Sequence, residues 1–284
     1  MDSYYYFIIS YSFLLIIIVT AGGIFMYQNY IFDLYGTLVD IRTNERKPSL
    51  WKYMASYMAL QGAAYTAPEL KKAYGQFINE VRRETHCKIT GSEKQNFFRT
   101  LPLRADYTPS LGEIEVNLSE VLERLYLVKG IKPTEEMISH WALMFRTLSL
   151  DYVRLFDGAR EVLTELHNRG KKVCLLSNAQ RLFTEPELRS LGIYNLFDDV
   201  FLSSDLRVMK PSPLFYGALL QKHHFAPEES VMIGNDWQAD AWGAYQNGLA
   251  SMYVHTAQSP EVTGELPPGC RILGSISEVL PIPT

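Results

Sequence analysis

Residues 31–40 read IFDLYGTLVD, and this stretch decides the fold that the rest of the chain must complete. Apolar residues lead into Asp33 and a Gly-Thr turn follows at Gly36, so the aspartate is expected to end a buried strand. Open α/β sheets place their ligand sites beyond the carboxyl ends of their strands. The stretch therefore predicts a first strand at residues 30–32 with a functional acid directly after it.

Four further short apolar runs resemble strands that are covered on both faces of a sheet. They are found at residues 172–176, 200–202, 231–233 and 251–254. Helical patterns lie between them, at residues 159–166 before Gly170 and at residues 214–219 after two prolines. The alternation predicts an α/β fold with a doubly wound, Rossmann-like parallel sheet and right-handed crossovers.

Residues 43–150 break the alternation, because their apolar residues keep only a helical period. One such pattern runs from Ile114 to Leu125 and another from Met137 to Leu148, and no convincing strand stands between Asp40 and about residue 155. We expect an inserted all-helical cap domain over the carboxyl edge of the sheet. Residues 27–42 and 151–284 would form the core domain, with a loop at residues 259–269.

Residues 1–26 form a hydrophobic N-terminal segment that permits two interpretations. Residues 7–26 carry no charge and as a helix would span the roughly 30 Å core of a bilayer. No Lys or Arg precedes Arg42 to set an orientation, and the first predicted strand follows without a linker. The segment is either a membrane anchor or an upstream extension before a start at Met26. The expected location is cytoplasmic, with anchoring by residues 7–26 as the alternative.

Composition limits the other classes of partner. The net charge of −4 offers no basic surface, so nucleic acid is not expected as a partner. The three cysteines, Cys87, Cys174 and Cys270, are widely separated and include no CxxC pair, which argues against a disulfide framework or a zinc site and favours a reducing compartment. The sequence carries no signal for an oligomeric state.

Polar residues recur where the predicted strands end or in the loops that follow. Because the carboxyl ends of parallel strands meet at one edge of a sheet, these residues are expected to converge on one crevice. They are Asp33, Ser177, Asn178, Lys210 in MKPSP, and Asp236 and Asp240 in GNDWQAD.

With FDLYGTLVD, LLSNA, the lysine of VMKPSP and IGNDWQAD in this order, residues 30–255 resemble the haloacid dehalogenase (HAD) superfamily of hydrolases. Any one of these motifs alone is a weak signal, whereas four in order form a strong one. The resemblance implies a Rossmann-like core, a nucleophile at Asp33 and a helical cap inserted after the first motif.

The residue types suit that chemistry on physical grounds. A carboxylate at Asp33 can attack phosphorus or carbon and form a covalent intermediate, which divides one difficult step into two. Thr37 and Ser177 can donate hydroxyl hydrogen bonds, and Lys210 supplies a positive charge to an anionic substrate. Ser177, Asn178 and Lys210 are therefore candidate substrate-binding residues.

The resemblance also implies a metal site. Asp33, the main-chain carbonyl of Tyr35 and the acids of the fourth motif would hold Mg²⁺, and such oxygen ligands suit this ion. Asn235 directly follows the glycine, where some members carry the metal-binding acid. Counting back from Asp240 favours Asp236 as the ligand, and Asp240 would act through water or by orienting the motif's lysine.

Tyr35 departs from the pattern of the superfamily's phosphatases. Most of them carry at this place a second aspartate, which protonates the leaving group and later activates water. A phenol with an ordinary pKa of about 10 is a poor substitute. The resembling stretch of the 2-haloacid dehalogenases, which work without a metal, does contain a tyrosine here, although those enzymes lack the metal-binding acid that Asp236 supplies. Tyr35 is therefore also a candidate substrate-binding residue.

The combined motifs favour a Mg²⁺-dependent phosphatase that acts on a small phosphorylated substrate through an aspartyl-phosphate at Asp33. With Tyr35 in place of the acid, good leaving groups such as those of acyl or aryl phosphates should be preferred. The first alternative is a metal-independent 2-haloacid dehalogenase. The second is a catalytically weak HAD domain that binds a phosphorylated ligand or a protein.

Overall fold

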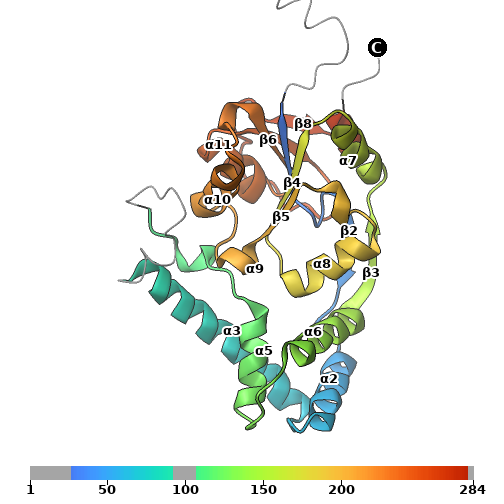
Figure 1. The fold of residues 1–284 in the computed structure, drawn as a ribbon, viewed down its shortest axis with the longest axis vertical. Helices are drawn as coiled ribbons and strands as arrows, with labels where there is room; N and C mark the ends of the chain where they lie inside the picture. Colours follow the sequence, from blue (N-terminus) through green and yellow to red (C-terminus); the bar gives the residue numbers. More distant parts are fainter. Residues whose placement is uncertain (1–26, 92–106, 281–284) are drawn as a thin grey trace, which may run out of the picture.

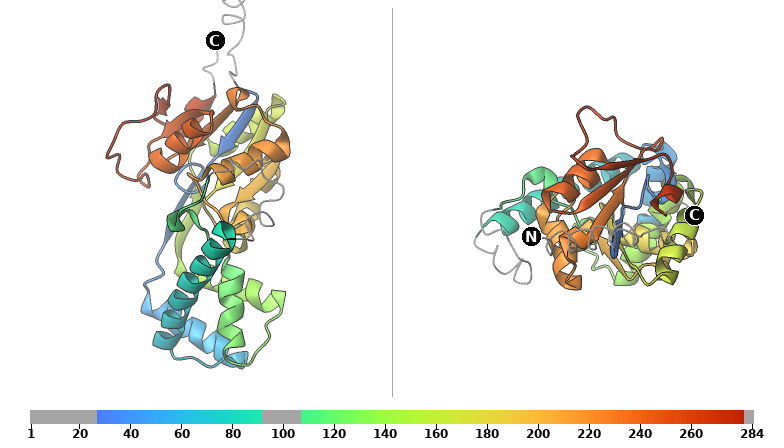
Figure 2. Two further views of the ribbon diagram at one scale, coloured as in Figure 1. Left: turned by 90° about the vertical axis from the view of Figure 1, so that its left-hand side faces the viewer. Right: turned by 90° about the horizontal axis from the view of Figure 1, so that it is seen from above.

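The computed structural model describes residues 27–91 and 107–280. The predicted hydrophobic segment, residues 1–26, lies outside the described residues. Within the described ranges, no helix combines the length and the apolar character needed to cross a membrane. Figures 1 and 2 show a lobe built on a sheet and, beyond the carboxyl ends of its strands, a lobe of helices.

A six-stranded sheet with only parallel pairs forms the core. Its order is β5-β4-β1-β6-β7-β8, so the first strand lies near the centre, with Phe32 level with Leu175 on one side and Ile233 on the other. The five predicted strands are confirmed, and β8 was missed because it has only three residues, of which Arg271 and Ile272 are exposed. The strands are β1 (Asn29–Phe32), β4 (Lys172–Ser177), β5 (Asp199–Leu202), β6 (Ser230–Gly234), β7 (Ala250–Val254) and β8 (Arg271–Leu273).

Helices cover both faces of the sheet, which explains the continuous apolar runs of its strands. Successive residues of β1 face opposite ways: Tyr30 and Phe32 pack with α7 (Ala159–Asn168), whereas Ile31 packs with α10 (Pro213–His223). The predicted helices at residues 159–166 and 214–219 are thereby confirmed. Helix α8 (Arg181–Ser190) and η5 (Ile276–Val279) share the face of α7, and α11 (Gly243–Gln246) shares that of α10.

Two strands outside the sheet connect the lobes. β2 (Val39–Thr43) and β3 (Leu150–Leu155) form an antiparallel ribbon, and Asp40 pairs with Arg154 across it at 2.7 Å. The expectation of no strand between Asp40 and residue 155 was wrong. The ribbon escaped notice because β3 is largely exposed and polar, so it lacks the apolar run of a buried strand.

Within residues 44–91 and 107–149, four helices make up the second lobe, as the helical periodicity predicts. They are α2 (Pro48–Leu60), α3 (Ala67–Thr90), α5 (Leu118–Leu127) and α6 (Glu135–Ser149). Their shared centre is aromatic: Trp141 stacks on Phe145 with ring centroids 4.9 Å apart, and Tyr74 stacks on both rings. Phe183 of α8 joins this cluster, so the helical lobe rests on the core at α8.

The pattern that begins at Ile114 was assigned wrongly at its start. Ile114 forms an antiparallel bridge with Val208 of the core, and α5 begins only at Leu118, where the Asn117 side chain caps it by accepting from Ser119 N. Ile114 is buried by this pairing and not by the packing of a helix. Its apolar side chain therefore fitted the helical period although the residue lies outside the helix. Residues 259–269 contain no helix or strand, which confirms the predicted loop.

The remaining elements are short. They are η1 (Leu111–Glu113), η2 (Tyr194–Leu196), α9 (Ser203–Leu206), η3 (Pro227–Glu229) and η4 (Trp237–Trp242), the last being a π-helical segment. Segment η4 follows β6 and carries Asp240, so the irregular helix lies at the predicted crevice.

Candidate active site

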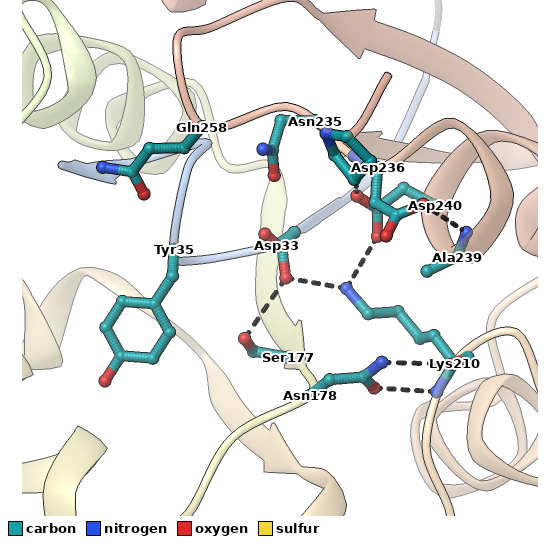
Figure 3. Close-up of a pocket in the computed structure, with 11 residues that line it drawn as sticks. Asp33, Tyr35, Ser177, Asn178, Lys210, Asn235, Asp236, Ala239, Asp240 and Gln258 are labelled. Atoms are coloured by element: carbon teal, nitrogen blue, oxygen red, sulfur yellow. Dashed lines mark hydrogen bonds and ion pairs between the residues drawn. The ribbon is translucent and has the colours of Figure 1, made fainter. Parts of the chain in front are cut away.

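A polar pocket of about 190 Å³ opens beyond the carboxyl ends of the central strands. In Figure 3 the side chains of Asp33, Ser177, Lys210 and Asp240 point toward one another. Among the described residues, every one that lines it belongs to the core and none to residues 44–149. The lining residues are Asp33, Tyr35, Ser177, Asn178, Lys210, Asn235, Asp236, Ala239, Asp240, Gln258 and Pro260.

Asp33 lies at the centre of the site because the hydrogen bond from its main-chain N–H to Ile233 continues the pairing of β1 beyond Phe32. Oδ1 of its carboxylate accepts from Lys210 Nζ at 2.8 Å and from Ser177 Oγ at 3.2 Å. Oδ2 accepts from Thr37 Oγ1 at 3.2 Å. Three donors thus fix the carboxylate, and its residual exposure of 8% is directed to the pocket.

Lys210 is almost completely buried between two carboxylates. Its Nζ donates to Asp33 at 2.8 Å and to Asp240 at 2.7 Å. Burial by itself would lower the pKa of the lysine, but the charges of Asp240 and Asp33 outweigh it and raise the pKa above its ordinary value. The ammonium ion is therefore a permanent positive charge at neutral pH.

Asp240 is engaged on both carboxylate oxygens. Oδ1 accepts from Lys210, and Oδ2 accepts from the main-chain N–H of Asp236 at 2.9 Å. Burial, only partly offset by Lys210, raises the pKa of Asp240 to about 7. Gly234 permits this placement, because a Cβ at that position would lie 2.1 Å from Asp240 Oδ2. This geometry fits the orientation of Lys210 rather than direct metal binding.

Asn178 lines the pocket, but its amide is already used within the protein. Its Oδ1 accepts from the main-chain N–H of Lys210 at 2.8 Å, and its Nδ2 donates to the Lys210 carbonyl at 3.0 Å. This pair of bonds ties the loop after β4 to the loop that carries the lysine. The arrangement makes Asn178 a support of Lys210 as well as a candidate substrate contact.

Tyr35 comes from the loop after Asp33, yet its hydroxyl turns away from the carboxylate (Figure 3). The phenol donates to Glu187 Oε2 at 2.5 Å and lies 3.1 Å from Thr184 Oγ1, both on α8. Arg146 of α6 pairs with the same glutamate at 2.6 Å and lies over the tyrosine ring. Burial, reinforced by the negative charge of Glu187, raises the pKa of Tyr35, so the phenol stays protonated.

Thr37 is fully buried and does not line the pocket. Its hydroxyl lies 3.2 Å from both Asp33 Oδ2 and Asn235 Oδ1, so it orients these two groups. Gly36, with φ of +85°, lets the Asn235 side chain pack against the backbone, because a Cβ there would lie 2.3 Å from Asn235 Nδ2. The Thr37 hydroxyl thus links the Asn235 side chain to the Asp33 carboxylate.

Asp236 caps the π-helical segment η4. Its Oδ1 accepts from the main-chain N–H groups of Gln238 and Ala239, both at 2.9 Å. The carboxylate lines the pocket, so its second oxygen is the one available to a ligand. Within the described ranges, no group of three His, Cys, Asp or Glu side chains is arranged to hold a metal ion. A metal here would need the Tyr35 carbonyl or the Asn235 amide as well as carboxylates.

The loop after β7 supplies part of the pocket that the motifs did not indicate. Gln258 and Pro260 line the site, and Gln258 Nε2 donates to Asp40 Oδ1 at 2.5 Å and to the Ile41 carbonyl at 3.0 Å. These bonds fix the loop to β2. Only its position after a strand of the sheet could have drawn attention to the loop, because its sequence matches no motif.

Comparisons with known proteins agree with this architecture. A model of the haloacid dehalogenase-like hydrolase family matches residues 27–248, which is most of the chain. Glyceraldehyde 3-phosphate phosphatase of Methanothermobacter thermautotrophicus is 26% identical over 120 residues, 42% of this chain and 53% of that protein. Phosphoglycolate phosphatase of Vibrio vulnificus is 33% identical over 97 residues, 34% of this chain and 42% of that protein.

The chain thus spans about half the length of these curated relatives. Among solved structures, the HAD hydrolase YfnB from Bacillus subtilis, described as bound to magnesium, has a TM-score of 0.47 at 16% identity and covers 89% of this chain and 96% of its own. The match of the family model to residues 27–248 contains all four motifs and the carboxyl ends of β1, β4 and β6. This chain belongs to the haloacid dehalogenase-like hydrolase family.

Proposed function

We propose that this hydrolase is a Mg²⁺-dependent phosphatase that acts on a small phosphorylated substrate through an aspartyl-phosphate on Asp33. The observation that carries the proposal is the Asp33 carboxylate at the strand end, fixed by Lys210 at 2.8 Å and exposed only to a polar pocket. The phosphatases among its relatives support the choice of phosphorus as the atom attacked.

In the first step an oxygen of Asp33 attacks phosphorus, and the bond from phosphorus to the leaving-group oxygen breaks as the new bond forms. Lys210 keeps its charge next to the attacking carboxylate and offsets the negative charge that builds on the phosphoryl oxygens. Ser177 orients the nucleophile and can redirect its hydroxyl to the substrate. In the second step water attacks the aspartyl-phosphate, which releases phosphate and restores Asp33.

Tyr35 determines which substrates can react quickly. Its phenol is occupied by Glu187 and Thr184, so no acid at this position points at the leaving group. The leaving group must depart as an anion, which favours acyl and aryl phosphates over alkyl phosphates. The same absence of a base at position 35 slows the attack of water, so the aspartyl-phosphate should accumulate and give a burst.

The residues present fit Mg²⁺ in donor chemistry and in charge. Asp33, Asp236 and the Tyr35 carbonyl offer the hard oxygens that this ion prefers, and the Asn235 amide is a further candidate. Among the lining residues, three aspartates face the single cation of Lys210, so the pocket would repel a phosphate dianion. When bound, Mg²⁺ would supply the missing positive charge and a Lewis-acid contact to the phosphoryl group.

The size of the pocket supports a small substrate. Its volume of about 190 Å³ is below the roughly 300–1,000 Å³ that is common for drug-sized ligands. Gln258 and Pro260 close one side of it, so these two core residues, rather than the helical lobe, are the nearest candidates for substrate selection.

A metal-independent 2-haloacid dehalogenase is the second candidate, and the orientation of Tyr35 favours it. Asp33 would attack the halogen-bearing carbon, halide would leave with the bonding electron pair, and water would hydrolyse the resulting ester. A halide leaves without a proton, so the tyrosine's engagement with α8 would cost nothing in this reaction.

The deciding experiment is a paired assay of the full chain with Mg²⁺ and with EDTA. It would follow phosphate release from acetyl phosphate, p-nitrophenyl phosphate and an alkyl phosphate, and halide release from L-2-chloropropionate. We expect Mg²⁺-dependent phosphate release in the order acetyl, aryl, alkyl, with a burst in the aryl reaction. Asp33→Asn should abolish the activity and serves as the control for a contaminating phosphatase.

Other outcomes would separate the alternatives. Halide release that EDTA does not change would establish the dehalogenase, and equal rates on alkyl and acetyl phosphate would contradict the assigned effect of Tyr35. Tyr35→Asp gives an independent test. If the site is that of a phosphatase, the variant should gain activity on alkyl phosphates. If it is that of a dehalogenase, the variant should lose halide release. No activity toward any of these substrates would favour the second alternative, a catalytically weak domain that binds a phosphorylated ligand or a protein.

A further inference from the structure

We propose that residues 113–118, named here the return segment, position the loop of Lys210 for catalysis, with Glu115 as a positioning residue. This segment leaves the helical lobe after α3, lies against the core, and goes back to the lobe at α5. Figure 1 shows it passing beside α9. The proposal rests on the proposed function only in treating Lys210 as catalytic.

The main chain of the return segment pairs with the residues that lead to Lys210. Met209 N donates to the Glu113 carbonyl and Glu115 N donates to the Arg207 carbonyl, both at 3.0 Å, on either side of the Ile114–Val208 bridge. Two residues of the 207–209 backbone are thereby fixed directly before the lysine. A loop held in this way cannot shift without breaking both bonds.

The side chain of Glu115 extends the contact to the loop after β4. Its Oε2 accepts from Ser203 Oγ at 2.8 Å, and the same hydroxyl accepts from the main-chain N–H of Ala179 at 2.9 Å. Ala179 directly follows Asn178, whose amide holds both main-chain groups of Lys210. Glu115 therefore reaches the lysine by a second route, through Ser203 and Asn178.

Gln180 closes the connection from the core side. Its Nε2 donates to the Val116 carbonyl at 2.6 Å, and its Oε1 accepts from Leu118 N at 3.0 Å. These bonds satisfy main-chain groups of the return segment that no neighbouring strand could pair with. The glutamine lies two residues after Asn178, so the segment and the loop after β4 support each other.

The return segment is also anchored by apolar contact. Ile114 is fully buried and joins the hydrophobic cluster of Val208, Leu214 and Phe215 on the α10 face of the sheet. Ile89, near the end of α3, belongs to the same cluster. The helical lobe thus contributes side chains to the core next to Lys210, although the described part of the lobe lines none of the pocket.

The test compares Glu115→Ala with Glu115→Gln in the full chain. Hydrogen exchange measured by mass spectrometry would follow the peptide of residues 203–212. The alanine variant should exchange about tenfold faster there, because local opening no longer breaks the bond to Ser203. The glutamine variant keeps an acceptor oxygen and should stay within about twofold of wild type.

The kinetic readout uses p-nitrophenyl phosphate and Mg²⁺. We expect Glu115→Ala to lower kcat about tenfold with KM changed less than about twofold, since the substrate pocket itself is untouched, and Glu115→Gln to restore kcat. Val121→Ala, in the buried centre of the helical lobe, is the control for general destabilisation. In this control, both the exchange rate of residues 203–212 and kcat should stay within about twofold of wild type.

Exchange in residues 203–212 that is equal in wild type and Glu115→Ala would overturn the proposal, as would an equal acceleration in Val121→Ala. Faster exchange with unchanged kcat in an active enzyme would also overturn it, because the segment would then hold the loop without affecting catalysis. A wild-type chain without phosphatase activity would instead contradict the proposed function, and the exchange experiment would still decide whether Glu115 holds the loop.

Discussion

The two lobes differ in how they relate to the pocket. Among the described residues, the core supplies all of the pocket's lining, from strand ends, the loops that follow them and η4, and side chains there are fixed by short polar contacts such as those of Lys210. The helical lobe is held together by aromatic stacking, and its Arg146 reaches Tyr35 through Glu187. The difference teaches that the candidate catalytic residues lie in the core, while the described part of the helical lobe contacts them only through intervening side chains.

The strongest way to break the core side of this comparison is Lys210→Met. The variant leaves Asp33 and Asp240 buried without their cation, and we expect a loss of about 3–5 kcal/mol in the free energy of unfolding. Urea denaturation would measure it. Adding Asp240→Asn should recover part of the loss, because one of the uncompensated charges is removed. If Lys210→Met alone is as stable as wild type, the buried ion pairs do not stabilise the fold.

The contact between the lobes is tested by Arg146→Met. This change leaves Glu187 largely buried beside Tyr35 without its partner, and we expect a loss of about 2–3 kcal/mol, smaller than at Lys210 because the arginine is more exposed. Glu187→Gln in the same chain should restore most of it. If Arg146→Met costs less than about 0.5 kcal/mol, the pair is no more than an ordinary surface ion pair.

A change of pH, measured in EDTA, tests the same site with a smaller effect per pH unit. The pKa of Asp240 is raised to about 7, above its ordinary 3.8, so the folded chain keeps a proton that the unfolded chain loses. The free energy of unfolding should therefore fall as pH rises from about 4 to about 7, by at most about 1.4 kcal/mol per pH unit. Above about pH 7, Asp240 should no longer make the free energy of unfolding depend on pH. Asp240→Asn should flatten this part of the profile in urea titrations at each pH. An unchanged profile in that variant would assign the slope to another group.

The sheet and its site could be predicted because both depend on local signals. Five of its six strands are short apolar runs, and the polar residue that ends a run needs only the rule for parallel sheets to be placed at one edge. Asp33, Ser177, Lys210 and Asp240 were found in this way, and they meet within hydrogen-bonding distance.

What could not be predicted depends on contacts between distant parts of the chain. The ribbon of β2 and β3 is polar, Ile114 resembles a helix residue until it meets Val208, and Gln258 belongs to a loop without a motif. The direction of the Tyr35 phenol also depends on a distant contact, because its partner Glu187 lies 152 positions further along the chain. No periodicity or spacing encodes a partner so far away.

The path of the chain has a consequence for exchanging parts between relatives. The polypeptide leaves the core through β2, touches it again at residues 113–118 and enters it for good through β3. A chimera joined only at the ribbon would import a foreign middle crossing, with no match for Gln180, Ser203 or Val208. The smallest unit that can be transplanted is therefore the helical lobe together with residues 178–210, so the lobe and the loop of the lysine must be exchanged jointly.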